Sequence, residues 1–449
     1  MKVSKTLKNK ITTRCDAFVD TLGIYRSALS FAIKVIDAEW SSLSACTTVK
    51  SVVPLAELLM HKTADNPNQR YGEFDKLFYK FPSYFRRSAI ADAYGIVKSH
   101  RSNLSNWELK KAEFEAKGKT LKDKPPTLSY SHYAFPVFYK KNMFIRTGEN
   151  SASIKVFKGG DWVWQDISFK GDSLKRLVGY KECSPSLVKK GRRFYLHTPC
   201  KATVTLCDKK PNEQTIIAVD LGLTNTAVCC AMKADGTVIG RLFINQPVEK
   251  DRMLSRLGRL KKAQQQSCIN SKNKLPNHWR KINNLQKQIV QDTVNKIVAF
   301  AQKYGATAIV FEYLGKFKHP RGKTSKVQKL RLKLQHWAKN RIQDKVKHKA
   351  HSLGIRFSRV VAANTSKLAF DGSGAVIRNA KQDLCEFKTG KKYHADLNAS
   401  YNIGARYFIG AILKTCPEKD RSQAMAKVPE LASRTRCVLA SLISLVKAI

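Results

Sequence analysis

The stretch TIIAVDLGLTNTAVCCAM, residues 215–232, contains two short apolar runs separated by a glycine. The first run, 215–220, is rich in β-branched residues and predicts a buried strand that ends at Asp220. Gly222 interrupts the pattern, and residues 224–232 predict a second strand. Asp235-Gly236 is a hairpin-turn dipeptide, so residues 237–245 are expected to return as a third, antiparallel strand.

Downstream of this hairpin, helical and strand patterns alternate. Three antiparallel strands, a helix, a strand, a helix and a strand is the element order of an RNase H-like core. The expected downstream elements are a basic helical stretch over about 249–287, an amphipathic helix at 288–305, a buried strand at 306–314, a basic helix over roughly 326–352 and a strand at 356–363.

The first half of the chain divides into two further regions. Residues 11–125 carry apolar residues at helical spacing and predict a helical block, which ends near Pro125-Pro126. Residues from about 130 to 208 contain short aromatic and β-branched runs that predict strands. The opening residues 2–11 are also strand-like, so the helical block is expected to be an insertion within a β region.

The charge of the chain is its most unusual bulk property. There are 82 Lys and Arg against 34 Asp and Glu, a net charge of +48, which suits a polyanion such as nucleic acid. No apolar run approaches the roughly 18 residues that span a bilayer, and no signal peptide is evident. The 11 cysteines include no Cys-x-x-Cys pair, which predicts free thiols in a reducing compartment. We therefore expect a cytoplasmic, membrane-independent protein that acts on nucleic acid.

Three acids fall at equivalent places in the predicted core. Asp220 ends the first strand, Glu312 lies near the end of the fourth strand, and Asp396 opens the final helix in HADLNASYNIGARY. In an RNase H-like sheet these ends converge, and three carboxylates there repel each other unless cations lie between them. Mg²⁺ prefers carboxylate oxygens, with Mn²⁺ as a substitute. Two such ions can activate a water and stabilise the leaving oxygen of a phosphodiester.

Each acid also has an ordinary structural alternative. Asp220 would end a strand before a glycine turn, Glu312 would be an exposed residue at a strand end, and Asp396 would be a helix N-cap. The occurrence of all three at the correct elements, in the correct order, favours the metal site over three separate coincidences.

A resemblance supports the same interpretation. The segments IIAVDLGLTNTAV, IVFEYLGKF and HADLNASYNIGARY resemble the three RuvC motifs of the TnpB family. These are RNA-guided DNA nucleases of insertion sequences, related to miniature type V CRISPR effectors and to Fanzor proteins. The resemblance covers about 200–413, and LQHWAKNRIQDKVKHKAHSLGI looks like the Trp-bearing helix of the family. It implies that Asp220, Glu312 and Asp396 are catalytic metal ligands and that Asn398 is a support residue.

The resemblance also implies a multidomain α/β fold. A RuvC-like RNase H nuclease domain would follow an N-terminal β-barrel wedge domain that carries an inserted helical recognition domain. The implied boundaries are 1–10 and 126–208 for the wedge, 11–125 for the recognition domain, 209–364 and 391–415 for the nuclease, 365–390 for a degenerate zinc-ribbon-like target-binding segment and 416–449 for a weakly helical C-terminal tail.

The zinc-ribbon segment departs from the family pattern. Family members usually carry four cysteines between a Thr-Ser pair and the last motif. Here Asn364-Thr365-Ser366 is present, but Cys385 is alone and one residue away from an expected position, and one thiol cannot make a tetrahedral zinc site. We therefore expect no structural zinc and a packed Cys385 thiol. The four expected cysteine positions are Ala369, Gly372, Glu386 and Thr389.

Two basic stretches are candidates for contact with phosphates. One lies in DRMLSRLGRLKKA, and the other spans 321–349, where 11 Lys and Arg accompany one acid, Asp344. An ordinary solvated helix face mixes charge signs, so these stretches favour nucleic-acid binding. The candidate residues are Arg252, Arg256, Arg259, Lys326, Lys329, Arg331, Lys333, Arg341 and Lys345.

The leading hypothesis is a Mg²⁺-dependent RNA-guided DNA endonuclease with one RuvC site and two Mg²⁺ ions. Its expected partners are a guide RNA, target DNA in double- and single-stranded form, and a second copy of the chain as a homodimer. Its expected location is the cytoplasm of a prokaryotic cell, on the nucleoid when bound to DNA. The alternatives are a guided, nuclease-inactive DNA-binding repressor and an unguided nuclease or resolvase of the RNase H superfamily.

Overall fold

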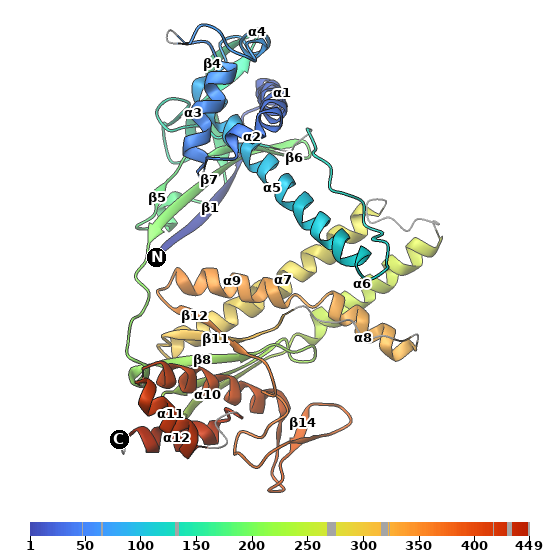
Figure 1. Ribbon diagram of the computed structural model, residues 1–449, viewed down its shortest axis with the longest axis vertical. Helices are drawn as coiled ribbons and strands as arrows, with labels where there is room; N and C mark the ends of the chain where they lie inside the picture. The colour runs from blue at the N-terminus through green and yellow to red at the C-terminus, as the bar shows by residue number, and fades with distance from the viewer. Residues whose placement is uncertain are drawn as a thin grey trace. The chain divides into compact units, whose positions relative to one another are not determined.

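The computed structural model describes residues 1–46, 48–63, 66–130, 134–266, 275–315, 322, 324–415, 417–428 and 433–447 (Figure 1). The chain forms two compact units. The N-terminal unit is Lys2–Ala202, and the C-terminal unit is Thr203–Ile449 together with Met1.

The N-terminal unit is built on a seven-stranded sheet of order β2-β3-β4-β1-β7-β5, in which β6 also pairs with β7. The first strand therefore lies among strands that come after the helical block, as expected from its sequence. Isolated bridges, Val137 with Ser186 and Lys140 with Phe144, continue the pairing from β6 toward β2. The strands are β1 (Lys2–Ile11), β2 (Phe144–Arg146), β3 (Ser151–Lys158), β4 (Asp161–Lys170), β5 (Lys181–Glu182), β6 (Ser186–Lys190) and β7 (Arg193–Thr203).

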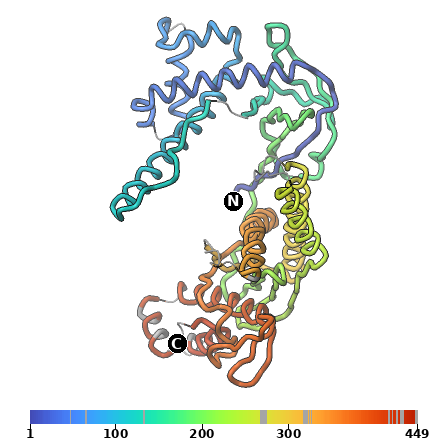
Figure 2. Tube along the Cα trace, turned by 90° about the vertical axis from the view of Figure 1, so that its right-hand side faces the viewer, coloured from blue at the N-terminus to red at the C-terminus, as the bar shows by residue number. Residues whose placement is uncertain are grey.

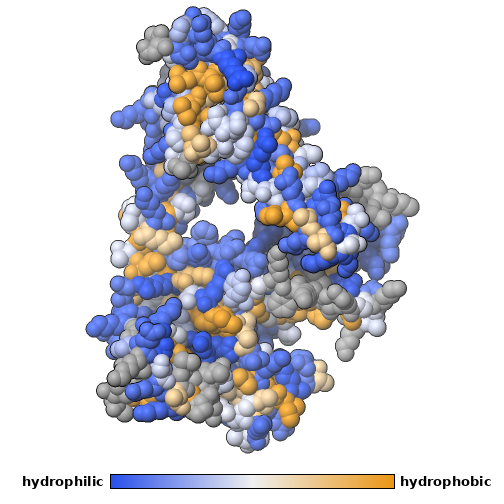
Figure 3. Space-filling view, in the orientation of Figure 1, coloured by the Kyte–Doolittle hydropathy of each residue, from blue (hydrophilic) through white to orange (hydrophobic). Residues whose placement is uncertain are grey.

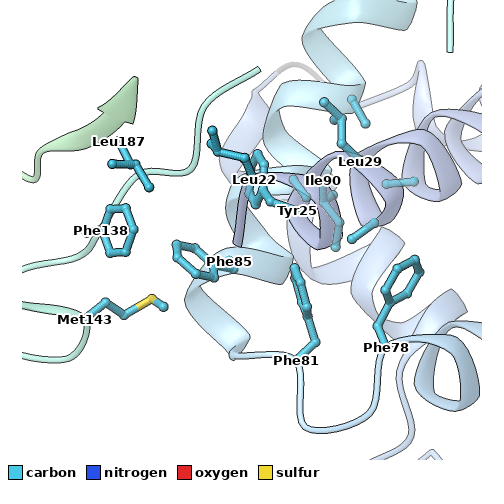
Figure 4. Close-up of a cluster of buried hydrophobic side chains, with 14 of the residues drawn as sticks. Leu22, Tyr25, Leu29, Phe78, Phe81, Phe85, Ile90, Phe138, Met143 and Leu187 are labelled. Atoms are coloured by element: carbon cyan, nitrogen blue, oxygen red, sulfur yellow. The ribbon is translucent and has the colours of Figure 1, made fainter. Parts of the chain in front are cut away.

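A helical block is inserted between β1 and β2 and shares one core with the sheet. Tyr25 and Phe85 are fully buried and meet edge to face, and Phe138 packs on Phe85 from the sheet side (Figure 4). In the last helix of this block, α5 (Ser83–Glu115), Val97 is the final buried residue. The second half of α5 extends away from the core (Figure 2). The helices are α1 (Ala17–Ala38), α2 (Trp40–Leu43), α3 (Val49–Met60), α4 (Glu73–Leu77) and α5 (Ser83–Glu115).

The C-terminal unit contains a five-stranded sheet of order β10-β9-β8-β11-β12. The first three strands in sequence are antiparallel, and β11 lies parallel to both β8 and β12. This is the strand order expected of an RNase H-like core. The strands are β8 (Thr215–Asp220), β9 (Ala227–Lys233), β10 (Val238–Ile244), β11 (Ala308–Tyr313) and β12 (Arg356–Val361).

Helices cover both faces of this sheet (Figure 1). Side chains alternate along β8, so Ile217 and Val219 pack toward α7 and α9, while Ile216 and Ala218 pack toward α10 and α12. No described helix is both long and apolar enough to cross a membrane. The helices are α6 (Pro247–Gln266), α7 (Pro276–Lys303), α8 (Ser325–Gln335), α9 (Lys339–His351), α10 (Ala395–Thr415), α11 (Glu418–Lys427) and α12 (Arg436–Lys447).

The structure differs from the expected elements at several places. The basic stretch expected over 249–287 does not end where the next helix was expected to begin, because α7 already starts at Pro276. The basic helix expected over 326–352 is broken between α8 and α9, where the carbonyl of His336 accepts a hydrogen bond from the side chain of Gln286. The expected C-terminal tail instead contributes to the core, because Leu439 and Leu442 of α12 are fully buried against α10.

A small three-stranded sheet lies between β12 and α10. It has the order β13-β14-β15 and is antiparallel throughout. Its strands are β13 (Ile377–Arg378), β14 (Leu384–Glu386) and β15 (Lys392–His394).

Candidate active site

The three predicted acids come from three elements of the C-terminal unit. Asp220 is the last residue of β8, and Glu312 is the fifth residue of β11. Because β8 and β11 are parallel neighbours in register, their carboxyl ends lie at the same edge of the sheet. Asp396 lies in the first turn of α10, which packs on β8 and β11. The fold therefore gathers the acids as the sequence predicted.

Electrostatics shows that these acids share one site. Burial raises the pKa of Asp220 well above its usual value, and the negative charges of Glu312 and Asp396 raise it further. The positive charge of Arg378 and a hydrogen bond from the Leu221 amide oppose this effect. The negative charges of both other acids therefore act on the Asp220 carboxyl. A residue that only ends a strand would not have two other carboxylates so close.

The structure also does not fit the structural alternatives for the other two acids, an exposed strand-end residue for Glu312 and a helix N-cap for Asp396. The Glu312 residue is 8% exposed, so it is not an exposed strand-end residue, and burial raises its pKa. A hydrogen bond from the Thr365 hydroxyl and the charge of Arg406 lower that pKa in part. Helix α10 begins at Ala395, so Asp396 lies inside its first turn and is not its N-cap.

The loop after β8 brings an amide to Asp396. Asn225 Nδ2 donates a hydrogen bond to Asp396 Oδ2 at 3.1 Å and lies 3.4 Å from His394 Nε2. A Cβ at Gly222 would lie 2.8 Å from the Asn225 carbonyl oxygen and 3.7 Å from Asp396 Oδ2. Glycine at position 222 therefore allows this loop to turn tightly beside the acid.

Two asparagines of α10 hold the segment that follows β12. The fully buried Asn398 accepts from the Phe370 amide and donates to the Leu368 carbonyl, both at 2.8 Å. Asn402 Nδ2 lies 3.0 Å from the Thr365 carbonyl and 2.9 Å from that of Leu368. Asn398 thus contacts backbone groups and not the acids, which is the position expected of a support residue.

The donor set suits a hard divalent cation. It consists of three carboxylates with an amide and a hydroxyl next to them, and Mg²⁺ prefers oxygen ligands. Positive charge at this place would relieve the repulsion that raises the pKa of Asp220. In the part of the chain that the structure describes, no three His, Cys, Asp or Glu side chains are arranged to hold an ion as they stand. Glu312 accepts a hydrogen bond from Thr365 and Asp396 accepts one from Asn225, and these bonds orient the two carboxylates.

Several neighbours of the acids were not singled out from the sequence. Lys250 of α6 lies close enough to Asp396 for the two charges to interact, as do Arg378 with Asp220 and Arg406 with Glu312. Only tertiary structure brings these cations to the acids, so no local pattern marks them. Thr365 had a signal in Asn364-Thr365-Ser366, but that motif served only to locate the zinc-ribbon segment.

The zinc-ribbon-like segment has an aromatic core. Phe370 meets Phe387, Tyr393 and Tyr401 at ring-centroid distances of 5.3, 5.1 and 5.2 Å. Ala369, at one expected cysteine position, is fully buried in the same cluster.

Two further residues of this segment, Cys385 and Gly372, lie against other parts of the protein. Cys385 is buried, and its thiol donates to the Tyr393 carbonyl at 3.4 Å. A Cβ at Gly372, another expected cysteine position, would lie 3.2 Å from Cys437 Sγ. The start of α12 therefore occupies the space beside that position.

The candidate basic residues lie on α6, α8 and α9. Arg252 and Arg259 are exposed, while Arg256 donates to the Lys281 carbonyl of α7 at 2.7 Å. On α9, Arg341 and Lys345 donate to Gln286 and Gln291 of α7 at 2.8 and 2.9 Å. These partners are neutral, so the hydrogen bonds leave the positive charges unbalanced. Lys329, Arg331 and Lys333 are exposed on α8, and the side chain of Lys326 lies outside the described residues.

Comparisons with known proteins find similarity for several parts of the chain. The model of the Aq_aa04 family matches residues 5–158, and the Cas12f1-like TNB domain matches residues 340–403, from α9 to the first turns of α10. The TnpB-like protein aq_aa05 of Aquifex aeolicus (strain VF5) is 25% identical over 245 residues, which is 50% of this chain and 78% of that protein.

Two solved structures are similar along most of the chain. The mini-RNA-guided endonuclease CRISPR-Cas_phi3 is 12% identical, with a TM-score of 0.51 over 91% of this chain and 92% of that one. A Cas12f1–sgRNA–target DNA complex is 16% identical, with a TM-score of 0.47 over 90% and 98% of the two chains. The first of these shares the multidomain α/β fold. The TnpB-like relative and the TNB-domain match, which reaches Asp396, make parts of the chain similar to TnpB-family proteins.

Proposed function

We propose that this protein is a Mg²⁺-dependent, RNA-guided DNA endonuclease with a single RuvC-type site. The observation that carries the proposal is the electrostatic interaction of Asp220 with Glu312 and Asp396 at one edge of the RNase H-like sheet. The names of the relatives support the class of activity, because one is TnpB-like and another is an RNA-guided endonuclease.

The acids would hold two Mg²⁺ ions, which when bound supply an activated water and stabilise the leaving oxygen of the phosphodiester. Asn225 orients Asp396 through its amide, and Thr365 orients Glu312 through its hydroxyl. Arg378, Arg406 and Lys250 add positive charge around the carboxylates, which favours the approach of a DNA phosphate.

A second feature supports nucleic acid as the partner. A groove of about 1010 Å³ lies between α7 and the start of α9, with the cations Arg280, Lys287, Lys339 and Arg341 in its wall. None of its described lining residues is a carboxylate, and Trp279 and Trp337 add aromatic surface. Cations interleaved with aromatic rings suit a nucleic-acid strand. Hydrophilic side chains cover most of the face seen in Figure 3.

The proposal extends to the remaining parts of the chain. The N-terminal sheet, from 1–10 and 126–208, would be the wedge that holds a structured RNA, and the helices of 11–125 would be the recognition domain. The segment 365–390 would bind target nucleic acid without zinc, and 209–364 with 391–415 would form the nuclease. Guide RNA would pair with one DNA strand, and the protein would then cut single- and double-stranded target DNA. A second copy of the chain is a further proposed partner, and the bacterial or archaeal cytoplasm is the proposed location.

The first experiment is to sequence the RNA that co-purifies with the protein expressed beside its native flanking DNA. A discrete RNA with one constant and one variable part would establish guidance and supply the reagent for cleavage assays. Heterogeneous host RNA would instead favour an unguided nuclease of the RNase H superfamily.

The second experiment tests catalysis with that RNA and a matching DNA. Asp220→Asn and Asp396→Asn should each lose about a hundredfold or more in cleavage, because metal-ion stabilisation is worth several kcal/mol. The control is Asp344→Asn, which changes an exposed acid of α9. Binding of target DNA without any cleavage by the wild-type protein would overturn the nuclease proposal and leave the guided repressor.

A further inference from the structure

A half-open, mainly apolar cavity of about 330 Å³ lies beside the candidate catalytic acids. Its wall includes Thr224 of the loop that follows Asp220, Leu254 and Leu257 of α6, Leu332 of α8, and Trp337 at the break between α8 and α9. The loop residue Gly222, which also lines the cavity, lies against Asp396. The cavity and the acids are therefore separated by a single loop.

Positive charge lies on the side of the cavity that faces the acids. Lys250 lines the cavity, donates a hydrogen bond to the Thr224 carbonyl and interacts electrostatically with Asp396. Lys333 of α8 also lines it and lies close enough for its charge to affect Lys250. One carboxylate, Asp251, is part of the wall, so the cations outnumber the acid.

A nucleotide matches this arrangement better than a wholly apolar or wholly anionic ligand. A base presents flat apolar faces, which suit Leu257, Leu332 and the Trp337 ring. Its phosphate would lie toward Lys250 and hence toward the acids. A base held in a stacked duplex cannot enter such a cavity unless it is first unpaired.

We propose that this cavity receives one unpaired base of the DNA strand that is being cut, and so places the adjoining phosphate at the acids. This inference rests on the proposed nuclease function and adds a selection rule to it. Apolar contact and stacking do not read the hydrogen-bonding edge of a base, so the cavity selects an unpaired nucleotide of any sequence over a paired one.

The first test changes the substrate and leaves the protein intact. The RNA-loaded protein cuts a series of single-stranded DNAs in which one nucleotide at a time, around the cleaved bond, is abasic. Loss of stacking at one position should lower kcat/KM about tenfold or more at that position and little elsewhere. A flat profile across all positions would overturn the inference.

The second test fills the cavity. Leu254→Trp places a large ring in it, and Leu353→Trp is the matched control, because the two leucines are 40% and 43% exposed and the second lies beyond α9. Leu254→Trp should lower kcat/KM on intact DNA about tenfold but have little effect on the sensitive abasic substrate. Equal losses on both substrates would mean that the substitution acts elsewhere, which would overturn the inference.

A binding measurement separates this inference from the proposed function. Asp220→Asn protein is titrated against single-stranded DNA that carries 2-aminopurine at each position in turn. Quenching at one position that disappears in the Leu254→Trp double variant supports the cavity, even if no guided cleavage is ever found. Cleavage without position-specific quenching would support the proposed function and contradict the inference about the cavity.

Discussion

Thr365 is the residue through which α10 reaches Glu312. It is 1% exposed, its hydroxyl donates to Glu312, and its carbonyl accepts from Asn402 of α10. Asp396 lies in the first turn of the same helix. One rigid element therefore carries one acid and, by way of Thr365, orients another, so the relative position of the two is set by α10.

Replacement of this hydroxyl tests its positioning role. Thr365→Val keeps the shape of the side chain but removes a hydrogen bond to a charged group, which is worth about 1.5–3 kcal/mol. We expect the Mg²⁺ concentration for half-maximal cleavage, and for half-maximal thermal stabilisation, to rise about tenfold or more. Thr365→Ser should restore both. Unchanged Mg²⁺ dependence in the valine variant would show that Thr365 serves packing alone.

The raised carboxyl pKa values predict how stability depends on pH. Burial holds the pKa of Asp220 and Glu312 above their usual values, so the folded protein binds these protons more tightly than the unfolded chain does. The free energy of unfolding of metal-free protein should therefore increase as pH falls through the raised folded-state pKa values toward the unfolded ones. Mg²⁺ binding requires the ionised carboxylates and should weaken over the same range.

Asp220→Asn isolates this effect. Removal of the buried charge should raise the Tm of the metal-free protein at neutral pH by about 2–4 °C for each kcal/mol released. The variant should also lose the Mg²⁺-dependent rise in Tm that the wild type shows. The measurement is thermal unfolding with EDTA or Mg²⁺ at two pH values. A metal-free variant that is less stable than wild type at neutral pH would contradict the electrostatic interpretation.

The acids could be predicted from the sequence, while their partners could not. Asp220 and Glu312 end short apolar runs, and such runs have a local pattern that periodicity detects. Arg378 and Lys250 approach the acids from a distant hairpin and a distant helix. The identity of a tertiary partner depends on the whole fold, and hence neither residue carries a signal of its own.

At the scale of elements, the break between α8 and α9 shows how a tertiary contact overrides a helical pattern. The residues from 326 to 352 have helical spacing with no proline or glycine. The chain nevertheless leaves the helix at His336, whose carbonyl accepts from Gln286 of α7. The His336 carbonyl accepts from α7 and not from an amide four residues further along its own helix. The cause of the break therefore lies in α7, outside residues 326–352.

The small sheet β13-β14-β15 packs against aromatic rings at the place where the sequence resemblance predicted a zinc ribbon. Phe370 packs between Phe387, Tyr393 and Tyr401, and the guanidinium of Arg436 from α12 lies 5.9 Å from the Phe370 ring centroid. The sequence predicted where the zinc-binding thiols would lie in the family pattern. It did not predict the aromatic core that is found there. Its rings come from two loop positions, the strand β15 and the helix α10.

A chelation experiment tests this element. We expect purified protein to carry no stoichiometric zinc and its Tm to be unchanged by a zinc chelator. Phe370→Ala should cost about 3–5 kcal/mol of unfolding free energy. Tyr130→Ala, at a residue 40% exposed in the N-terminal unit, is the control. One zinc per chain, with a Tm that drops on chelation, would refute the aromatic-core account.

At the scale of the whole molecule, a net charge of +48 makes nucleic-acid affinity strongly dependent on salt. Arg341 and Lys345 lie on α9, where their described partners are amides of α7. Their charges are thus available to phosphates, unlike those of basic residues held in ion pairs.

Two substitutions on this surface should change the salt dependence. Arg341→Gln and Lys345→Gln should each reduce the slope of log Kd against log salt concentration by about 1. The control is Lys414→Gln, on the last turn of α10 at the other face of the sheet. Fluorescence anisotropy with RNA at several salt concentrations gives the slopes. Identical slopes for all four proteins would remove α9 from the nucleic-acid surface.

The central place of β1 in its sheet has a consequence for how the protein is made. Lys10 of β1 pairs with Lys170 of β4, so the strand leaves the ribosome some 160 residues before this partner exists. At ~5–20 residues per second, β1 waits roughly 8–32 s. During that interval its exposed lysines oppose pairing with other nascent chains, as edge-strand lysines do in finished proteins. These lysines are Lys2, Lys5, Lys8 and Lys10.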